Sequence, residues 1–324
     1  MIVVLAGGVG GARLARGIQR VIPAGELTVI VNTADDFEHL GLAVSPDLDT
    51  VMYTLAGLEN PSQGWGLAGE TWSFMAAMDK IGGETWFRLG DRDLATHVER
   101  TRRLAAGSTL ADVTARFCAA LNISAHLLPM TNDRVRTLVH SDDGILAFQD
   151  YFVRLQCEPR IRSLDFEGAV SASACPAALA ALRAPSLEAI VLAPSNPFVS
   201  VAPIFAVAEL GIGITRRTVP LVAVCPIIGG KAVKGPAAKM MAELGHEVSA
   251  LGIARHYRGI IDGLVIDNTD GDAAQPIREL GMAVHVTDTI MSDDEGRRRL
   301  AAATLGFART LRSSAPWRDR PPVV

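Results

Sequence analysis

Apolar runs and helical patterns alternate along most of this chain. It opens with the run "MIVVLAG", and a second run, "ELTVIVNT", follows a helical pattern over about residues 12–21. Uninterrupted apolar runs of this length are typical of strands buried on both faces of a parallel sheet. The N-terminal stretch therefore predicts a strand–helix–strand unit.

Four later runs have the same character. They read "EAIVLAPS", "VPLVAVCPII", "GLVIDNT" and "MAVHVTDT", and each has an amphipathic helical pattern beside it. Strands and helices that alternate in this way build a Rossmann-like, doubly wound α/β fold around one mostly parallel sheet. We predict this nucleotide-binding core for residues 1–64 and 129–311.

Three other stretches depart from this alternation. Residues 65–128 have helical periodicity almost throughout, with Ser108 and Asp112 as start signals, and predict a helical insertion or cap. The segment "GILAFQDYFVRLQCEP" predicts either an antiparallel hairpin or a strand that returns to the sheet. The proline-rich tail, residues 312–324, is expected to be ordered poorly or only by contact with another surface.

Composition and charge narrow the class of protein. Of the 324 residues, 49% are hydrophobic and 5% aromatic, and the formal net charge is -4, so the chain lacks the basic footprint of a general nucleic-acid binder. No apolar stretch approaches the ~20 residues of a membrane span, and the first run is too short for a signal peptide. We therefore expect a cytoplasmic protein with neither a nucleic-acid nor a membrane partner. Its four cysteines form no close pair and are expected to be free thiols.

Four glycines follow the first run: Gly7, Gly8, Gly10 and Gly11. Glycine lets the backbone pass close to a ligand, and the following helix directs free N–H groups and its positive end toward an anion. The loop predicts a phosphate cradle, although glycines also permit close packing of a strand against a helix. Its spacing lacks the Gly-Lys-Ser/Thr ending of a Walker loop and the third glycine of a dinucleotide fingerprint.

Polar residues follow the second run. Asn32 and Thr33 lie at the carboxyl end of the predicted strand, beside the glycine loop, where open α/β sheets bind ligands. Carboxylates beside a phosphate site indicate a divalent cation, and Mg²⁺ takes one or two carboxylates together with phosphate oxygens and water. We predict Asp36 and Asp49 as magnesium ligands, with Asp47 as a further candidate. The alternative is that these carboxylates are solvated loop or cap residues.

Two later strand-end loops carry candidate ligand groups. "LAPSNPFVSVAPI" offers Ser195 and Asn196 as hydrogen-bonding side chains. "PIIGGKAVKGPAAKMM" repeats the glycine pattern and adds Lys234, whose charge favours a diphosphate. A solvated basic surface is the competing interpretation of this lysine.

Six stretches carry a resemblance to a known family, in the family's order and over about residues 1–311. They read "LAGGVGGARLARGI", "NTADDFEHLGLAVSPDLDTVMYTLAG", "WFRLGDRDLATHVERT", "LLPMTNDRVRTLV", "LAPSNPFVSVAPI" and "CPIIGGKAVKGPAAKMM". The chain resembles the 2-phospho-L-lactate transferases of coenzyme F-420 biosynthesis. Enzymes of this family transfer a phospho-acid unit from a guanylyl diphosphate donor to the ribityl hydroxyl of the deazaflavin FO and release GMP, with magnesium.

The resemblance implies the same reaction here, in a homodimer. It assigns FO binding and catalysis to Asp49 and Arg88, and part of the acceptor site to the helical insertion. An arginine can clamp an acceptor oxygen or balance phosphate charge, and a salt bridge to Asp91 or Asp93 is the alternative role of Arg88. The three-carbon acid stays open between phospholactyl, phosphoenolpyruvyl and 3-phosphoglyceryl units.

Two other functions remain in view. A non-catalytic nucleotide-sugar-binding regulator of the gluconeogenesis-factor type shares the glycine-rich start, but that group tends to carry a Pro-Pro-Gly-Asp turn where this chain has "SPDLDT". A Rossmann dehydrogenase would use Asp35 or Asp36 on a ribose. Trp65, Trp72 and Trp86 are candidate walls for a flat deazaflavin ring. The seven histidines show no catalytic or metal pattern and are expected to be packing, capping or surface residues.

Overall fold

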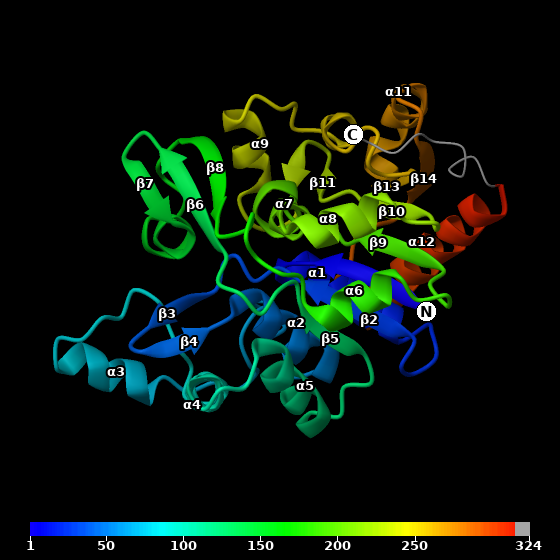
Figure 1. Cartoon of the computed structure of the whole chain (residues 1–324). Coiled ribbons are helices and arrows are strands. Elements are labelled where there is room, and N and C mark those ends of the chain that lie inside the picture. Colours follow the sequence, from blue (N-terminus) through cyan, green and yellow to red (C-terminus); the bar gives the residue numbers. More distant parts are fainter. Residues whose placement is uncertain (315–324) are drawn as a thin grey trace.

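A seven-stranded sheet forms the centre of the molecule. The computed structural model describes residues 1–314 (Figure 1). The strand order is β14-β13-β10-β9-β1-β2-β5, and every neighbouring pair is parallel. The strands are β1 (Ile2–Ala6), β2 (Leu27–Val31), β5 (His126–Pro129), β9 (Ala189–Leu192), β10 (Leu221–Val224), β13 (Gly263–Asp267) and β14 (Ala283–Thr287). The predicted α/β fold with a mostly parallel sheet is confirmed.

Six of these strands coincide with predicted apolar runs. The exception is β5, which pairs with β2 at the edge of the sheet. Its four residues, "HLLP", are too few to carry a recognisable period, and only the short segment 121–125 separates them from the preceding helix. The predicted helical insertion, residues 65–128, therefore ends inside a strand of the central sheet.

Helices cover both faces of the sheet (Figure 1). One face carries α1 (Gly8–Gln19), α2 (Pro46–Ala56), α5 (Leu110–Ala120) and α12 (Asp294–Ser314). The other carries α6 (Pro176–Leu182), α7 (Ala202–Ala206), α8 (Ala208–Thr215), α9 (Ala237–Glu243), α10 (Ala250–His256) and α11 (Ala274–Glu279). Val4 and Ala6 of β1 pack on the first layer, whereas Val3 and Leu5 pack on the second, as the two-residue period of a strand requires.

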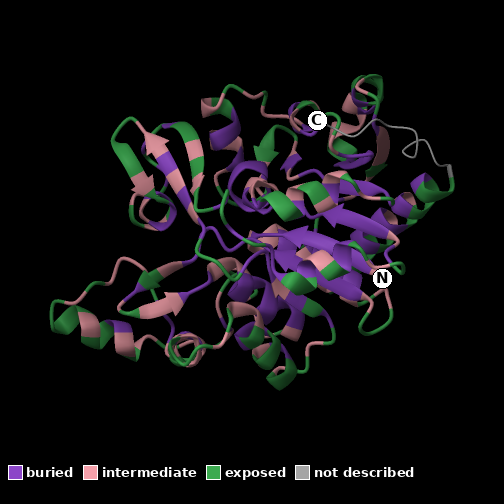
Figure 2. Ribbon diagram, viewed as in Figure 1, coloured by how far each residue is buried: buried purple, intermediate pink, exposed green. Residues whose placement is uncertain are grey.

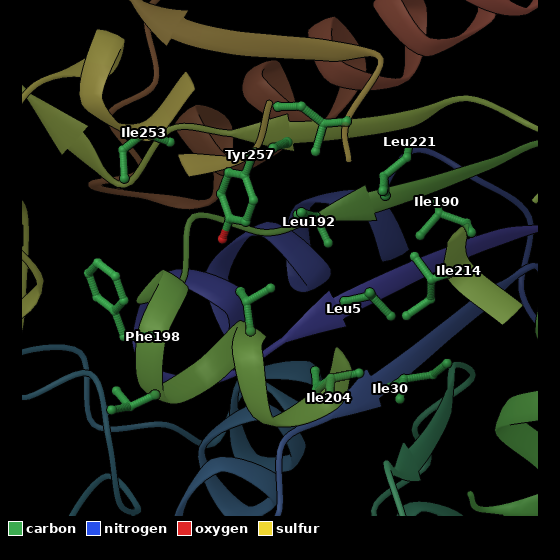
Figure 3. Packing of buried hydrophobic residues seen from close by; sticks show 14 of the residues in the cluster. Leu5, Ile30, Ile190, Leu192, Phe198, Ile204, Ile214, Leu221, Ile253 and Tyr257 are labelled. Carbon is green, nitrogen blue, oxygen red and sulfur yellow. The ribbon is translucent and has the colours of Figure 1, made fainter. Parts of the chain in front are cut away.

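The second of these layers is drawn in Figure 3. Side chains from four adjacent strands meet helix side chains there, among them Leu5, Ile30, Ile190, Leu192, Leu221, Ile204 and Ile214. Figure 2 shows that the inner strands of the sheet are buried, whereas the edge strand β14 is only partly buried and the outer surfaces of the helices are exposed. Burial on both faces explains why the strands read as continuous apolar runs.

Two smaller units lie on the same side of the central sheet (Figure 1). The first comprises β3 (Phe37–His39), β4 (Leu42–Val44), α3 (Ser73–Lys80) and α4 (Asp93–Ala105). The second is an antiparallel sheet of β6 (Arg136–Ser141), β7 (Gly144–Ala147) and β8 (Ile161–Glu167), in the order β7-β6-β8. A π-helical turn, η1 (Asp150–Arg154), follows β7. The antiparallel alternative for this segment is thus the one that the structure adopts.

Short elements complete the described chain. They are η2 (Pro197–Val201), β11 (Ile227–Ile228), β12 (Lys231–Ala232) and η3 (Asn268–Ala273). Helix α5 starts one residue later than predicted, because Thr109 rather than Ser108 is its N-cap, in a reciprocal capping box with Asp112. The predicted tail begins inside α12, since residues 312–314 are helical, and its remainder lies outside the described residues.

Two further expectations concern the cysteines and the membrane. Free thiols are confirmed, because all four cysteines are buried and unpaired: Cys118, Cys157, Cys175 and Cys225. Among residues 1–314, no single helix has the length and apolar character needed to cross a membrane. Only the segments 197–206 and 208–215, which meet at a 95° bend, reach that length and composition when taken together.

Candidate active site

The sheet order reverses between β1 and β9. From β1 the chain moves outward to β2 and β5 on one side, then returns to β9 on the other side of β1. Ligands of open α/β sheets bind outside the carboxyl ends of the strands at such a point, because the loops from the two strands diverge there. Both of these loops line a pocket of about 670 Å³.

Three groups of residues form most of the lining of this pocket. The glycine wall comprises Gly7, Gly8, Gly10, Pro194, Ser195, Asn196 and Ser200. The acidic wall comprises Asp35, Asp47, Asp49, Tyr53, Asp93 and His97. The aromatic wall comprises Phe148, Gln149, Phe152, Val153 and Gln156. Arg88, Lys234, Trp65 and Trp86 also face the pocket, so eight of the predicted site residues line it: Gly7, Gly8, Gly10, Asp49, Arg88, Ser195, Asn196 and Lys234.

The glycine loop is shorter than predicted. Helix α1 begins at Gly8 rather than near Ala12, with Gly7 as its N-cap. The Gly8 N–H donates to Oδ1 of Asp47 at 2.7 Å, and the Gly7 N–H donates to Oγ of Ser195 at 3.2 Å. Two amides that were predicted to hold phosphate therefore bind side chains of the protein itself in this structure.

Close packing accounts for two of the other glycine contacts. A Cβ on Gly10 would lie 2.2 Å from the carbonyl oxygen of Pro194, and one on Gly11 would lie 2.9 Å from Oγ of Ser195. Gly11 does not line the pocket. A Cβ on Gly8 would meet nothing within 4 Å, and its φ of +63° favours glycine. Of these three glycines, Gly8 is the one whose open side is available to a ligand.

The side chain of Asn32 does not line the pocket, but it bonds to three residues that do. Its Nδ2 donates to Oδ2 of Asp35 at 3.0 Å, to Oδ2 of Asp47 at 3.1 Å and to the carbonyl of Val199 at 3.2 Å. Asn32 and its neighbour Thr33 are buried behind the pocket surface. The two predicted nucleotide-binding residues after β2 thus lie one layer behind the pocket.

Asp35 is buried and Asp47 is half-buried on the acidic wall, and the carboxyl groups of both accept hydrogen bonds from Nδ2 of Asn32. Burial raises the pKa of Asp35 well above its ordinary value, and the charge of Asp47 raises this pKa further. Burial likewise raises the pKa of Asp47 to about 6, against the hydrogen bonds from Asn32 and Gly8. A cation beside two such carboxyl groups would favour their charged forms.

The two predicted metal ligands are engaged by protein donors. Asp36 lies outside the pocket lining and accepts a hydrogen bond from Oγ of Ser45 at 2.7 Å, and burial raises its pKa to about 7. Asp49 does face the pocket, but both of its carboxylate oxygens accept hydrogen bonds from Arg100. Nη1 donates to Oδ2 at 3.0 Å, and Nη2 donates to Oδ1. Arg100, which was not among the predicted site residues, is only 2% exposed and is therefore almost completely shielded from solvent.

The face of α4 that meets α2 carries further polar groups. Nε2 of His97 lies 3.3 Å from Oδ2 of Asp93, and Nδ1 of the same ring lies 3.3 Å from Nη1 of Arg100. The Tyr53 hydroxyl donates a hydrogen bond to Oδ1 of Asp93. His97 was expected to be a packing, capping or surface residue, yet it lines the pocket. The signal was present in the sequence, because the spacing of Asp93, His97 and Arg100 places them on one helix face.

Arg88 is exposed at the mouth of the pocket. Its guanidinium carbon lies 4.1 Å from the centroid of the Trp72 ring, a cation–π contact that takes the place of the alternative salt bridge to Asp91 or Asp93. Trp65 and Trp86 line the pocket as expected, whereas Trp72 supports Arg88 from outside it.

The remaining predicted ligand groups also stabilise the loops that carry them. Oδ1 of Asn196 accepts from the N–H of Phe198 at 2.9 Å and caps η2. Nζ of Lys234 donates to the carbonyl of Gln63 at 2.8 Å and joins two loops that are far apart in sequence. Within residues 1–314, no three His, Cys, Asp or Glu side chains lie close enough together to hold one metal ion by themselves.

Comparison with known proteins gives the family. Residues 2–304 match the family model described as 2-phospho-L-lactate transferase CofD. The chain belongs to this family. The resemblance stated from the sequence is thereby confirmed, and the protein is a transferase of the 2-phospho-L-lactate transferase type.

Curated relatives extend over the full family domain. A phosphoenolpyruvate transferase of Streptomyces griseus is 41% identical over 318 residues, which cover 96% of this chain and 99% of the relative. A 2-phospho-L-lactate transferase of Methanosarcina mazei is 36% identical over 299 residues, which cover 92% and 97%. A solved UPF0052-family protein of Bacillus halodurans has a TM-score of 0.61 at 15% identity, covering 94% of this chain and 98% of that one, and shares the fold. These relatives give no support to the regulator alternative.

Proposed function

We propose that this transferase moves a phosphorylated three-carbon acid unit from a guanylyl diphosphate donor to the terminal ribityl hydroxyl of FO, and that GMP leaves. The observation that carries the proposal is the convergence of Asp49 and Arg88 with the glycine wall around one pocket at the switch point of the sheet. Its volume of about 670 Å³ is within the usual range for small-molecule sites.

The reaction that we propose is a displacement at phosphorus. The ribityl oxygen of FO bonds to the phosphorus that carries the acid, the bond from that phosphorus to the bridging oxygen breaks, GMP departs with that oxygen, and the hydroxyl proton of FO passes to solvent. Such transfers depend chiefly on positioning and charge compensation. Asp49, held in one orientation by Arg100, accepts a hydrogen bond from the attacking hydroxyl, and Arg88 balances charge on the transferred phosphate.

We further propose that Mg²⁺ assists, with ligands that differ from those expected. Asp35 and Asp47 both line the pocket and share the Asn32 amide as a hydrogen-bond donor, and the charge of Asp47 raises the pKa of Asp35, so a cation beside them would favour the ionised pair. Two carboxylates suit Mg²⁺, which completes its shell with water and phosphate oxygens. Bound magnesium would neutralise charge on the diphosphate. Asp36 and Asp49 fit less well, because Asp36 lies outside the pocket lining and the charge of Asp49 is already balanced by Arg100.

Of the three candidate acids, phosphoenolpyruvate is the one that we favour. The streptomycete relatives named phosphoenolpyruvate transferase are 40–42% identical to this chain, whereas the Methanosarcina relatives named 2-phospho-L-lactate transferase are 34–36% identical. Both groups align over more than 90% of the chain.

We also propose that the protein is a homodimer, as the family resemblance implies. Sedimentation velocity measures this oligomeric state directly.

Incubation with FO, Mg²⁺ and each of the three guanylyl donors tests the proposal, with mass spectrometry of the deazaflavin product. We expect product with the phosphoenolpyruvyl donor and loss of product when EDTA removes the metal. Arg88→Ala is expected to lower product formation on the order of 10²-fold. Arg102→Ala is the matched control, because Arg102 projects from α4 to solvent and pairs with Glu99.

The outcomes separate the parts of this proposal. Absence of product from every donor, with a folded protein, would contradict the transfer to FO. Product with the phospholactyl donor alone would correct the choice of acid. Full activity of Asp35→Asn and Asp47→Asn at limiting Mg²⁺ would remove these two residues as metal ligands.

A further inference from the structure

The aromatic wall has no assigned role, and its backbone is unusual. Strand β7 ends at Ala147, and the chain then enters the π-helical turn η1, in which the Leu155 N–H donates to the carbonyl of Asp150 at 2.8 Å. π-Helical turns are rare and frequently lie at functional sites. Gln156 and Cys157 follow with φ values of +50° and +60°, a left-handed conformation that non-glycine residues rarely adopt. Such local strain persists only where surrounding contacts maintain it.

Contacts with the core hold this segment from behind. Tyr151 is fully buried, and its carbonyl accepts from the Cys157 N–H at 2.8 Å. Nζ of Lys239, on α9, lies 5.8 Å from the centroid of the Tyr151 ring and donates a hydrogen bond to the carbonyl of Pro159 at 3.1 Å. At the other end, Nε2 of Gln149 donates to the carbonyl of Asp35 at 3.0 Å. The turn is therefore rigidly attached to both the core and the acidic wall.

This anchoring turns one aromatic side chain toward the pocket. Phe152 lines the pocket and is 38% exposed, although the residue before it is fully buried. Phe148, 7% exposed, lines the same wall, and its ring is nearly parallel to that of Phe152, with an interplanar angle of 8° and centroids 5.4 Å apart. An exposed flat face supported by a second ring is suited to stacking with a planar ligand.

We propose that Phe152, supported by Phe148, is a stacking platform for the heteroaromatic ring of a substrate. The carboxamide of Gln156, on the same wall, offers both a donor and an acceptor at the edge of that ring. A lactam edge, in which a carbonyl adjoins an N–H, is complementary to such a carboxamide. The inference rests on the proposed function, because that reaction supplies two planar rings with a lactam edge, the guanine of the donor and the deazaflavin of FO.

Direct binding measurements identify which ring uses the platform. FO binding is followed by its intrinsic fluorescence and GDP binding by calorimetry, with full-length wild-type protein and three variants: Phe152→Ala, Phe152→Leu and Phe152→Trp. We expect Phe152→Ala to weaken one ligand about 5- to 100-fold and to leave the other nearly unchanged. Phe152→Leu should lose most of the same affinity because it lacks a flat face, and Phe152→Trp should retain it.

The controls separate binding from folding. Ile145→Ala alters an exposed apolar residue of β7 outside the pocket and should leave both affinities unchanged. Each variant is accepted only when its melting temperature matches that of the wild type. Because Phe152 is on the pocket surface, these substitutions are expected to leave the core intact.

Two results would overturn the platform alone. The first is unchanged affinity of Phe152→Ala for both ligands in a protein whose wild type forms product, which leaves the proposed reaction standing. The second is a Phe152→Leu variant that binds as tightly as the wild type, because apolar area and not a planar face would then be sufficient. A wild-type protein that binds neither FO nor GDP would overturn the platform and the proposed function together.

Discussion

The glycine wall and the acidic wall face the same pocket but are held in opposite ways. The glycine wall depends on the absence of side chains, since a Cβ on Gly10 would overlap the carbonyl oxygen of Pro194. The acidic wall depends on buried charge, because Asp49 on α2 and Arg100 on α4 are paired across 51 residues of sequence. One wall is fixed by backbone approach within the sheet edge, and the other by an ion pair between two helices. They should therefore fail in different ways when altered.

The largest effect is expected at Arg100. Arg100→Met leaves Asp49 buried without its partner and should lower the free energy of unfolding by ~3–5 kcal/mol. Product formation should also fall, because Asp49 loses its fixed orientation. Denaturant unfolding and the product assay measure the two effects.

A double variant identifies the physical cause. Asp49→Leu combined with Arg100→Met removes both charges and should recover most of the stability while remaining inactive. If Arg100→Met alone were as stable as the wild type, the acidic wall would not depend on this ion pair.

An intermediate effect is expected in the glycine wall. Gly10→Ala should destabilise the protein by ~1–3 kcal/mol, because the added Cβ forces α1 away from the loop after β9. Gly8→Ala should cost ~1–2 kcal/mol through its left-handed φ, with no packing overlap, but its methyl group faces the pocket.

The contrast between the two alanines is the useful measurement. For the same loss of stability, Gly8→Ala should weaken donor binding more than Gly10→Ala, as calorimetry with GDP would show. Equal donor affinity of the two variants would contradict the assignment of Gly8 as the glycine open to ligand.

The smallest effect at neutral pH comes from a histidine behind the glycine wall, because it lowers stability only on acidification. The ring of Phe198, in the loop after β9, packs against His246 and His256. Burial lowers the pKa of His256 to about 4, with the nearby His246 as a second cause. Between pH 6.5 and 4 the unfolded chain therefore binds a proton that the folded protein does not, so stability falls as the pH falls through this window, by at most ~1.4 kcal/mol per pH unit.

Substitution isolates this contribution. His256→Gln should show a shallower loss of stability between pH 6.5 and 4 than the wild type, measured by urea unfolding at each pH. His126→Gln, at an exposed position on β5, serves as the control and should follow the wild type. Parallel curves for wild type and His256→Gln would show that this ring does not titrate as expected.

The sequence predicted those parts of the site that are local to a strand end. The glycines follow β1 directly, and Ser195 and Asn196 follow β9, so once the runs are read as parallel strands these loops must share one edge of the sheet. Asp49 and Arg88 came from family motifs, and both face the pocket. Apolar runs sufficed for the five inner strands that they predicted because burial on both faces leaves a continuous signal, and β14 was found from its run although it is only partly buried.

Only the tertiary structure decided which polar groups are partners. It placed Asp47 rather than Asp36 beside the glycine loop, paired Asp49 with Arg100, and added the strand β5 to the sheet edge. These outcomes depend on the direction of side chains in loops and on contacts between helices that are distant in sequence. A local sequence pattern reports neither of these. The aromatic wall has the same origin, because the π-helical turn that exposes Phe152 is held by Lys239, which contacts Tyr151, and by Asp35, from two other regions of the fold.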